Sequence, residues 1–273
     1  MIRSIIRNAR LARGTGTTIR AKFSIFFSLM RVGFKSRYSN EKNKECSESF
    51  FGYKVWGFDY STLDYLFREV FLSKEYSFEP TTPEPVIIDC GSNIGMSILY
   101  FKDLFPKAKI SGFEANPNTY KLLKKNVETN NLQDVQLYNV ALSDHDGEIS
   151  FFISENIGTL VGSTRSDRGG SVELKCVASK LSDHIKHFDK IDLIKMDVEG
   201  SEHLIIKDLV ESSCMKIADQ FLVEYHHHIN NDPSMLADFL KKFETSGFDY
   251  SIKAGFRTLG SFQDILIHFY KRK

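Results

Sequence analysis

The chain has 273 residues, of which 42% are hydrophobic, a length and composition that favour one large domain with an appendage. Its net charge of +1 conceals a division, because residues 1–40 carry nine Lys and Arg and no acid. The remaining residues, 41–273, hold 27 bases against 35 acids, a net charge of −8. Phosphate binding needs a positive face, so this acidic body argues against a nucleic-acid partner.

Residues 1–49 are predicted to form a basic N-terminal arm. Its apolar stretch FSIFFSLM (23–30) is far shorter than the ~20 residues that cross a bilayer. No small-residue cleavage site follows this stretch, so we expect neither a membrane span nor a secretory signal. Bases alternate with Ile, Leu and Phe, which favours peripheral membrane contact through residues 1–40, although Gly14 and Gly16 interrupt the helix. A helical arm packed on protein is the alternative.

The cysteines bear on the compartment in which the protein works. Cys46, Cys90, Cys176 and Cys214 are scattered, with no C-x-x-C pair and no histidine at zinc-finger spacing. Four reduced thiols in the cytoplasm is the expectation that follows.

Residues 50–84 are predicted to form a small substrate-side extension. The segment YKVWGF (53–58) has the pattern of a short strand, and the apolar residues of 63–71 recur at helical spacing on one face. The proline-rich segment EPTTPEP (79–85) then marks the boundary with a catalytic domain of residues 85–273.

Beyond this boundary, short apolar strands alternate with amphipathic helices. Strands are predicted at 85–90, 108–115, 135–144, 147–154, 171–179, 191–200, 220–228, 248–254 and 264–270, and helices at 94–105, 117–130, 201–213 and 233–247. Segments 147–154 and 171–179 alternate like paired antiparallel strands around a Gly/Ser-rich loop and form a β-insertion. The whole pattern predicts an α/β fold with a mostly parallel, doubly wound sheet.

The first strand of this domain ends in a glycine loop, VIIDCGSNIG (86–95). Dinucleotide-binding folds use G-x-G-x-x-G, whereas this loop has Asp89 before glycines four residues apart. Asp89 would repel a pyrophosphate, but a carboxylate attracts a sulfonium or an α-amino group. Glu114, at the end of the next strand and 25 residues after Asp89, is suitably placed to accept hydrogen bonds from both hydroxyls of a ribose. These features favour S-adenosylmethionine over NAD.

Four segments in this order, VIIDCGSNIG, GFEANP, NVALSD and IDLIKMDVEGSE, resemble the motif series of the FkbM-type methyltransferases over roughly residues 50–228. The strand end VEYHHH also resembles the Glu-x-His of this family. These are class I O-methyltransferases that depend on S-adenosylmethionine. The resemblance implies a Rossmann-like fold whose seven-stranded, mostly parallel sheet has an antiparallel last strand, together with the N-terminal extension and the β-insertion.

The resemblance also implies a set of cofactor-binding residues. It assigns the methionine moiety to Asp89, Gly91, Asn93 and Gly95, the ribose to Glu114 with support from Asn116, the adenine to Ala141, Leu142 and Ser143, and the reacting centre to Asp197.

An acceptor hydroxyl is a poor nucleophile until a base removes its proton. The candidates are Asp197, Glu199, Glu202, Glu224 and His226. We prefer Asp197 and His226, with Glu199 as a third catalytic residue. A magnesium site built on Asp197 and Glu224 is an alternative that we considered, but the prediction is that no metal is bound.

The predicted function is therefore O-methylation of a hydroxyl on a glycan or secondary-metabolite acceptor, a small molecule or glycan rather than a nucleic acid. Two alternatives remain open at the level of the sequence. One is an NAD-dependent oxidoreductase. The other is a non-catalytic Rossmann-like protein that docks on a membrane surface through its basic arm.

Overall fold

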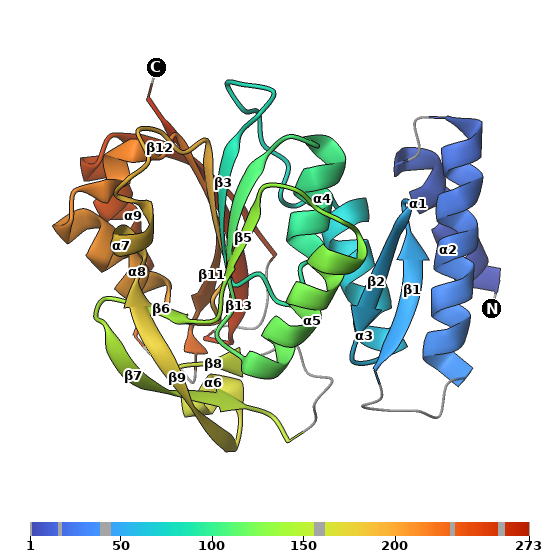
Figure 1. Ribbon diagram of the computed structural model, residues 1–273, viewed down its shortest axis with the longest axis horizontal. Helices are drawn as coiled ribbons and strands as arrows, with labels where there is room; N and C mark the ends of the chain where they lie inside the picture. Colours follow the sequence, from blue (N-terminus) through green and yellow to red (C-terminus); the bar gives the residue numbers. More distant parts are fainter. Residues whose placement is uncertain are drawn as a thin grey trace.

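The computed structural model describes residues 2–15, 18–38, 45–155, 162–229, 233–255 and 260–272. Its centre is a seven-stranded sheet in the order β12-β13-β11-β10-β3-β4-β5 (Figure 1). The strands are β3 (Val86–Cys90), β4 (Lys109–Phe113), β5 (Val135–Tyr138), β10 (Leu193–Met196), β11 (Gln220–His227), β12 (Phe248–Ala254) and β13 (Gln263–Lys271). Only β13 runs antiparallel to its neighbours, β11 and β12. The predicted mostly parallel sheet with an antiparallel last strand is confirmed.

Helices cover both faces of this sheet, as the alternating pattern predicts (Figure 1). On one face lie α4 (Met96–Leu104) and α5 (Pro117–Thr129), and on the other lie α7 (Leu181–Ile185), α8 (Glu202–Glu211), the short η2 (Cys214–Ile217) and α9 (Leu236–Thr245). Two apolar clusters, one on each face, are built from buried side chains of these helices and of the strands. Burial at about 25 cal/mol per Å² of apolar surface stabilises both layers.

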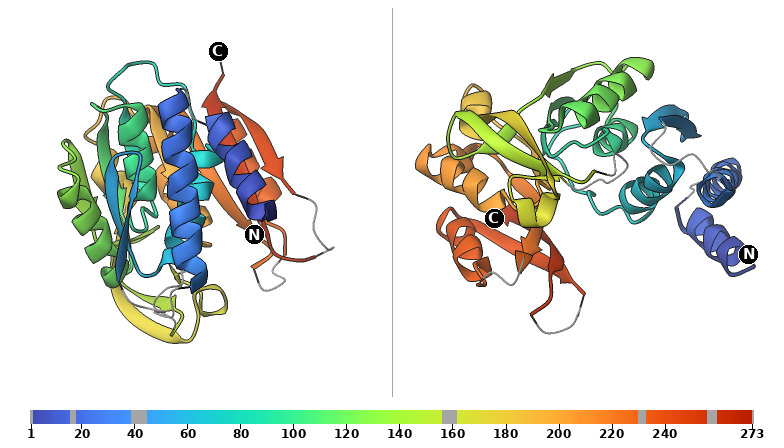
Figure 2. Two further views of the ribbon diagram at one scale, coloured as in Figure 1. Left: turned by 90° about the vertical axis from the view of Figure 1, so that its right-hand side faces the viewer. Right: turned by 90° about the horizontal axis from the view of Figure 1, so that it is seen from below.

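The N-terminal part packs outside α4 and α5 (Figure 2). It comprises α1 (Ile2–Thr15), α2 (Ile19–Tyr38), β1 (Cys46–Phe50), β2 (Tyr53–Gly57), α3 (Tyr60–Leu66) and the π-helix η1 (Phe67–Leu72). Strand β1 was not predicted, because its polar residues resemble a linker. It pairs antiparallel with β2, and its Glu48 binds Arg31 and Lys35 of α2 at 2.7 and 3.1 Å.

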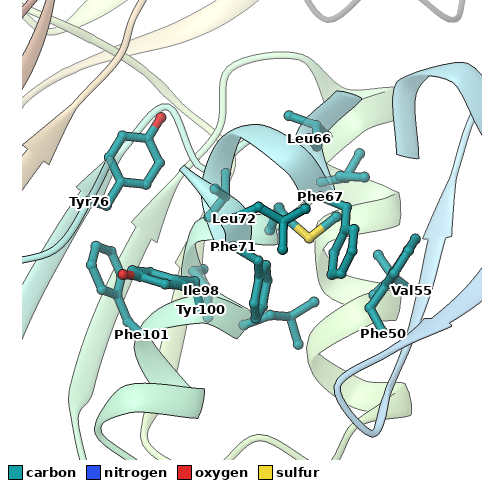
Figure 3. Close-up of a cluster of buried hydrophobic side chains, with 14 of the residues drawn as sticks. Phe50, Val55, Leu66, Phe67, Phe71, Leu72, Tyr76, Ile98, Tyr100 and Phe101 are labelled. Atoms are coloured by element: carbon teal, nitrogen blue, oxygen red, sulfur yellow. The ribbon is translucent and has the colours of Figure 1, made fainter. Parts of the chain in front are cut away.

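Aromatic packing joins this N-terminal part to the sheet domain (Figure 3). Phe50 of β1 stacks on Phe67 of η1, with ring centroids 4.1 Å apart. Phe71 of η1 meets Tyr100 of α4 edge to face at 5.5 Å. The proposed extension, residues 50–84, therefore shares one apolar core with the catalytic domain.

The segment predicted as a single strand at 135–144 is two strands in different sheets. After β5 the chain turns, and β6 (Ala141–Ser143) joins β7 (Gly147–Ile153), β8 (Gly162–Ser163) and β9 (Val172–Lys180) in a second sheet. The Asn139 side chain marks the turn, since its Nδ2 donates to the carbonyls of Glu114 and Ala115 at 2.8 and 3.1 Å. The predicted pairing of 147–154 with 171–179 is confirmed as β7 and β9. The short helix α6 (Ser166–Gly169) completes the insertion.

Within the described ranges, no helix has both the length and the apolarity needed to span a bilayer. All four cysteines have free thiols.

Candidate active site

The glycine loop between β3 and α4 is held against the end of β4. The backbone N–H groups of Gly91 and Ser92 both donate to the Phe113 carbonyl, at 3.0 and 2.8 Å. Gly91 has a φ of +80°, and a Cβ at this position would lie 1.8 Å from the Asp197 carbonyl oxygen. Only glycine fits here, and the close approach is to the neighbouring strand end.

Gly95 and Asn93 complete the turn of this loop. Gly95 is the N-cap of α4 with a φ of +90°, and a Cβ there would meet the Leu123 side chain at 2.7 Å. It lines neither cavity described below. Asn93 also has a positive φ, of 50°, and lines both cavities. Of the two, only Asn93 is placed to touch a ligand.

Asp89 is fully buried behind the loop and lines neither cavity. Its Oδ2 accepts from Ser97 Oγ at 2.6 Å, and its Oδ1 lies 3.3 Å from Lys195 Nζ on β10. Lys195, itself 2% exposed, donates to the Gly91 carbonyl at 2.8 Å. The carboxylate therefore anchors the loop through Lys195.

Glu114 lies at the end of β4 with its carboxylate fixed by two backbone donors. Oε1 accepts the Asn116 N–H at 2.9 Å and Oε2 accepts the Asn93 N–H at 3.0 Å. Each oxygen keeps one lone pair for a further donor. Burial raises the pKa of Glu114 to about 7, although these two backbone bonds oppose the shift. The Asn116 side chain caps α5 by accepting from the Asn118 N–H at 3.0 Å.

The first cavity lies beyond the carboxyl ends of β3 and β4, and residues of β6, β7 and β8 in the second sheet form part of its wall. Its walls are Gly91, Asn93, Phe113, Glu114, Ala115, Asn116, Thr119, Val140, Ala141, Leu142, Phe151, Gly162, Thr164, Asp197, Val198, Glu199 and Ser201. Ala141 and Leu142, which are predicted to lie near the adenine, line this cavity. Ser143 is fully buried and is absent from its walls.

A second, wider cavity of about 480 Å³ adjoins the first. Four residues, Gly91, Asn93, Asp197 and Glu199, line both cavities, so the two meet at the end of β10. The extension supplies much of the rest of the wall, namely Ser61, Thr62, Tyr65, Leu66, Glu69, Val70 and Tyr76. Whether residues 50–84 lie on the substrate side stays a prediction.

An acid–histidine cluster stands where the cavities meet. His226 of β11 is buried and lines neither cavity; its Nδ1 lies 2.6 Å from Oε1 of the equally buried Glu202. Its Nε2 lies 3.1 Å from Glu199, 3.8 Å from Asp197 and 3.9 Å from Asp264. Burial alone would lower the pKa of His226, but the charges of Glu202 and Glu199 outweigh it and raise that pKa well above its ordinary value.

The carboxylates of this cluster differ in their basic neighbours and in their pKa shifts. Arg168 of α6 binds Glu199, with Nε 2.7 Å from Oε2. Burial raises the pKa of Asp197, while Lys195, 3.8 Å away, opposes the shift. The charge of Asp197, followed by burial, raises the pKa of Glu224 to about 9. The cavity wall thus holds more negative charge than its neighbouring lysine and arginine neutralise.

Sequence reasoning missed several residues of the second cavity: Tyr65, Glu69, Arg168, Lys195 and Asp264. Asp264 carried a weak signal as an acid at the start of the last strand. It pairs directly with His226 across β11 and β13, a register that depends on the folded topology. Lys195 was hidden inside the motif KMDVEGSE, where its partner Asp89 is remote in sequence.

The strand order, the glycine loop after β3 and the carboxylate after β4 together define a Rossmann-like class I methyltransferase. The Methyltransferase FkbM domain family matches residues 89–250, and the chain belongs to this family. Its methyl donor is S-adenosylmethionine, and the protein is a methyltransferase. The predicted family, fold and cofactor are confirmed, and the family match favours a methyltransferase over the alternative of an NAD-dependent oxidoreductase.

Three curated relatives resemble the chain over 45–62% of its length. Methyltransferase 1 of Beauveria bassiana is 26% identical over 58% of this chain and 74% of its own. The 2-O-methyltransferase NoeI of Sinorhizobium fredii is 33% identical over 45% of this chain and 57% of its own. Hexuronic acid methyltransferase AglP of Haloferax volcanii is 26% identical over 62% of this chain and 66% of its own.

Proposed function

We propose that this protein transfers a methyl group from S-adenosylmethionine to a hydroxyl oxygen of a saccharide acceptor. The observation that carries the proposal is the meeting of two cavities at Asp197, one shaped by the glycine loop and Glu114 and the other wide and rich in hydrogen-bonding side chains. The name of one relative, 2-O-methyltransferase, favours a hydroxyl oxygen as the acceptor. The name of another, hexuronic acid methyltransferase, favours a saccharide over a purely apolar secondary metabolite.

The first cavity would hold the donor. The two free lone pairs of Glu114 would accept the two ribose hydroxyls, and the Asn116 N–H would keep the carboxylate in place. Ala141 and Leu142 would face the adenine, while Gly91 and Asn93 would face the methionine moiety. Asp89, Gly95 and Ser143 would act as positioning residues, since none of them lines a cavity.

Asp197 is our candidate for the proton acceptor, because this residue lines both cavities whereas His226 lines neither. When bound, S-adenosylmethionine supplies the methyl group, and its carbon–sulfur bond breaks with the electron pair going to sulfur. As the acceptor oxygen forms its bond to the methyl carbon, Asp197 takes the hydroxyl proton. His226, whose Nε2 lies 3.8 Å from Asp197 and 3.1 Å from Glu199, would hold the Asp197 carboxylate in place. Much of the rate would come from alignment of the reactants in the joined cavities.

Transfer of a ¹³C-labelled methyl group tests this function. The protein is incubated with methyl-labelled S-adenosylmethionine and a panel of neutral sugars, amino sugars and hexuronic acids, and the products are examined by ¹³C NMR. The proposal expects a methyl ether on a saccharide hydroxyl. Methylation only of nitrogen, of carbon or of the hexuronic acid carboxylate would contradict it.

The raised pKa of Glu114 predicts a pH-dependent donor site. The ionised carboxylate accepts both ribose hydroxyls, so binding favours the deprotonated form of a group whose pKa in the ligand-free protein is about 7. We expect affinity for S-adenosylhomocysteine to fall as pH drops below about 7, by up to about tenfold per pH unit. For folding the sign is opposite: because the folded pKa exceeds the ordinary 4.5, the ligand-free protein loses stability as pH rises towards about 7.

Calorimetric titrations between about pH 5.5 and about pH 8.5 measure this dependence. The Glu114→Gln variant serves as the control, because it has no proton to gain over this range. An equal pH dependence in both proteins would assign the effect to another group.

We also propose that the N-terminal helices contact an anionic membrane surface. On α2, Ile19, Phe23, Phe27, Phe34 and Tyr38 recur at nearly regular helical spacing and are each 57–75% exposed. The surrounding residues 1–40 carry nine bases and no acid. Glu48 of β1 neutralises only part of this charge, through Arg31 and Lys35. An exposed apolar row on such a basic segment matches the interface of an anionic bilayer.

Vesicle co-sedimentation tests this contact. With vesicles of phosphatidylserine and phosphatidylcholine, Phe23→Ser/Phe27→Ser should bind about tenfold more weakly than the wild type, since each ring buries apolar surface in the interface. The control Val177→Ser/Ile252→Ser removes two exposed apolar side chains that lie away from α2, on β9 and β12. No binding by the wild type, or equal binding by both double variants, would refute the proposal.

A further inference from the structure

Two buried polar atoms of the acid–histidine cluster face each other without hydrogen-bond partners. They are Nε2 of His226 and Oδ1 of Asp264, which lie 3.9 Å apart. The His226 side chain is only 1% exposed, and although its Nε2 lies 3.1 Å from Glu199 the geometry makes no hydrogen bond. An unsatisfied buried polar atom costs about 1–3 kcal/mol, so a facing pair calls for a ligand.

The strand register brings a third donor to the same place. His226 of β11 lies directly opposite Asp264 of β13, and Glu224 precedes His226 by two residues. Alternate residues of a strand share a face, so the Glu224 and His226 side chains project the same way. Glu224, His226 and Asp264 each offer one ligand atom, and these atoms lie within 4.8 Å of one another.

Such a spacing suits a single cation. Donors about 2.1 Å from one octahedral cation lie about 3 Å apart when adjacent and about 4.2 Å apart when opposite. At most one donor pair can be opposite, so cation binding would draw the other pairs, including His226 and Asp264 at 3.9 Å, in to about 3 Å. Glu224 and Asp264 line the wider cavity, which leaves the remaining coordination positions open to water or to an acceptor.

Glu202 orients the histidine for this role. Its Oε1 lies 2.6 Å from His226 Nδ1 and also accepts the Gly200 N–H at 3.1 Å. A histidine that binds a metal through one nitrogen usually donates its other N–H to a carboxylate, which fixes the tautomer. With Nδ1–H held by Glu202, the lone pair of Nε2 points at the carboxylates.

Glu224 and Asp264 differ from two other acids of the cluster in having no lysine or arginine partner among the described residues. Glu199 is paired with Arg168, and Asp197 lies 3.8 Å from Lys195. Among the residues that the structure describes, no lysine or arginine nitrogen lies within 4.0 Å of Glu224 or Asp264. The charge of a protonated His226 would lie nearer to Glu199, at 3.1 Å, than to Asp264, at 3.9 Å.

We propose that Glu224, His226 and Asp264 bind one divalent cation at the wall of the wider cavity. Two carboxylates and an imidazole suit Mn²⁺ or a similar first-row ion, since imidazole favours transition metals and carboxylate favours harder ions. The role of the cation rests on the proposed function: an open coordination position in the acceptor cavity would bind and polarise the acceptor hydroxyl, with Asp197 still taking its proton.

Mn²⁺ titration of the purified protein, followed by electron paramagnetic resonance, tests the site without any acceptor. We expect one Mn²⁺ per chain, and affinity at least about tenfold lower in Glu224→Gln and in Asp264→Asn, because each loses a charged ligand. Asp249→Asn on the neighbouring strand β12 is the matched control, since it removes one exposed acid that is paired with Arg272. Its affinity for Mn²⁺ should equal that of the wild type.

Electron spin echo envelope modulation adds a signature that a diffuse acidic surface cannot give, namely coupling of Mn²⁺ to a histidine nitrogen. This coupling should be present in the wild type and in Asp249→Asn, and absent in His226→Gln; if His226→Gln fails to fold, the Asp264→Asn titration still decides the proposal. No Mn²⁺ binding, no nitrogen coupling, or equal affinity in Asp264→Asn and Asp249→Asn would overturn it. S-adenosylhomocysteine binding by the wild type, measured separately, reports on the proposed function alone.

Discussion

Replacing Glu114 by glutamine should weaken the binding of S-adenosylhomocysteine by about 2–3 kcal/mol, a factor of about 30–150. The glutamine keeps one carbonyl oxygen, but its amide nitrogen would face a backbone N–H that now donates to the carboxylate, either that of Asn116 or that of Asn93. Two charge-assisted acceptors for the ribose become at most one neutral acceptor. Isothermal titration calorimetry near pH 8, where the wild-type carboxylate is ionised, measures the loss.

The matched control for this prediction is Glu128→Gln on α5. Glu128 is exposed, with its carboxylate 3.8 Å from Lys124, and lies outside both cavities. Its affinity should equal that of the wild type. Thermal unfolding of the ligand-free proteins separates a binding defect from a folding defect. An unchanged affinity in a folded Glu114→Gln protein would remove Glu114 from the donor site.

Replacing Gly91 by alanine should destabilise the protein by more than about 3 kcal/mol. The added Cβ would lie 1.8 Å from the Asp197 carbonyl oxygen, and backbone atoms of two buried strand ends cannot move apart cheaply. Gly52→Ala is the control, since Gly52 has a similar φ of +90° but no atom within 4 Å of the added Cβ. It should cost only about 1–2 kcal/mol, the penalty of a left-handed conformation.

Chemical denaturation of both glycine variants measures this difference. A loss in Gly91→Ala no larger than in Gly52→Ala would show that the loop and β10 can separate. The contrast matters for interpretation, because the sequence suggests that Gly91 permits approach to a ligand. The structure adds that Gly91 first permits β3 to approach β10, so its substitution is a poor probe of cofactor contact alone.

Most of the sheet could be predicted from the sequence, because buried parallel strands are short apolar runs between amphipathic helices. The failures occur where local pattern and tertiary pairing disagree. Residues 135–144 are continuously strand-like, yet the Asn139 side chain bonds to the end of β4 and the chain changes sheets. Strand β1, CSESF, is polar and becomes a strand through its pairing with β2 and the ion pairs of Glu48.

The candidate site was predictable where strand ends carry a recognisable motif. Glu114 and Asp197, which the sequence singles out, directly follow β4 and β10, and both line the first cavity. Asp89 also lies in a recognisable motif near a strand end, but it lines neither cavity. Its side chain instead approaches Lys195, which lies beside it on β10. Asp264 enters the cluster through an antiparallel register, which no local pattern encodes.

A crystal structure of the protein with S-adenosylhomocysteine bound tests the central claim most directly. The account predicts the ribose hydroxyls on the Glu114 carboxylate, the adenine against Ala141 and Leu142, and the sulfur at the junction of the two cavities beside Asp197. The wider cavity should remain open for the acceptor. A ligand whose ribose lies away from Glu114, or whose sulfur is remote from Asp197, would contradict the account.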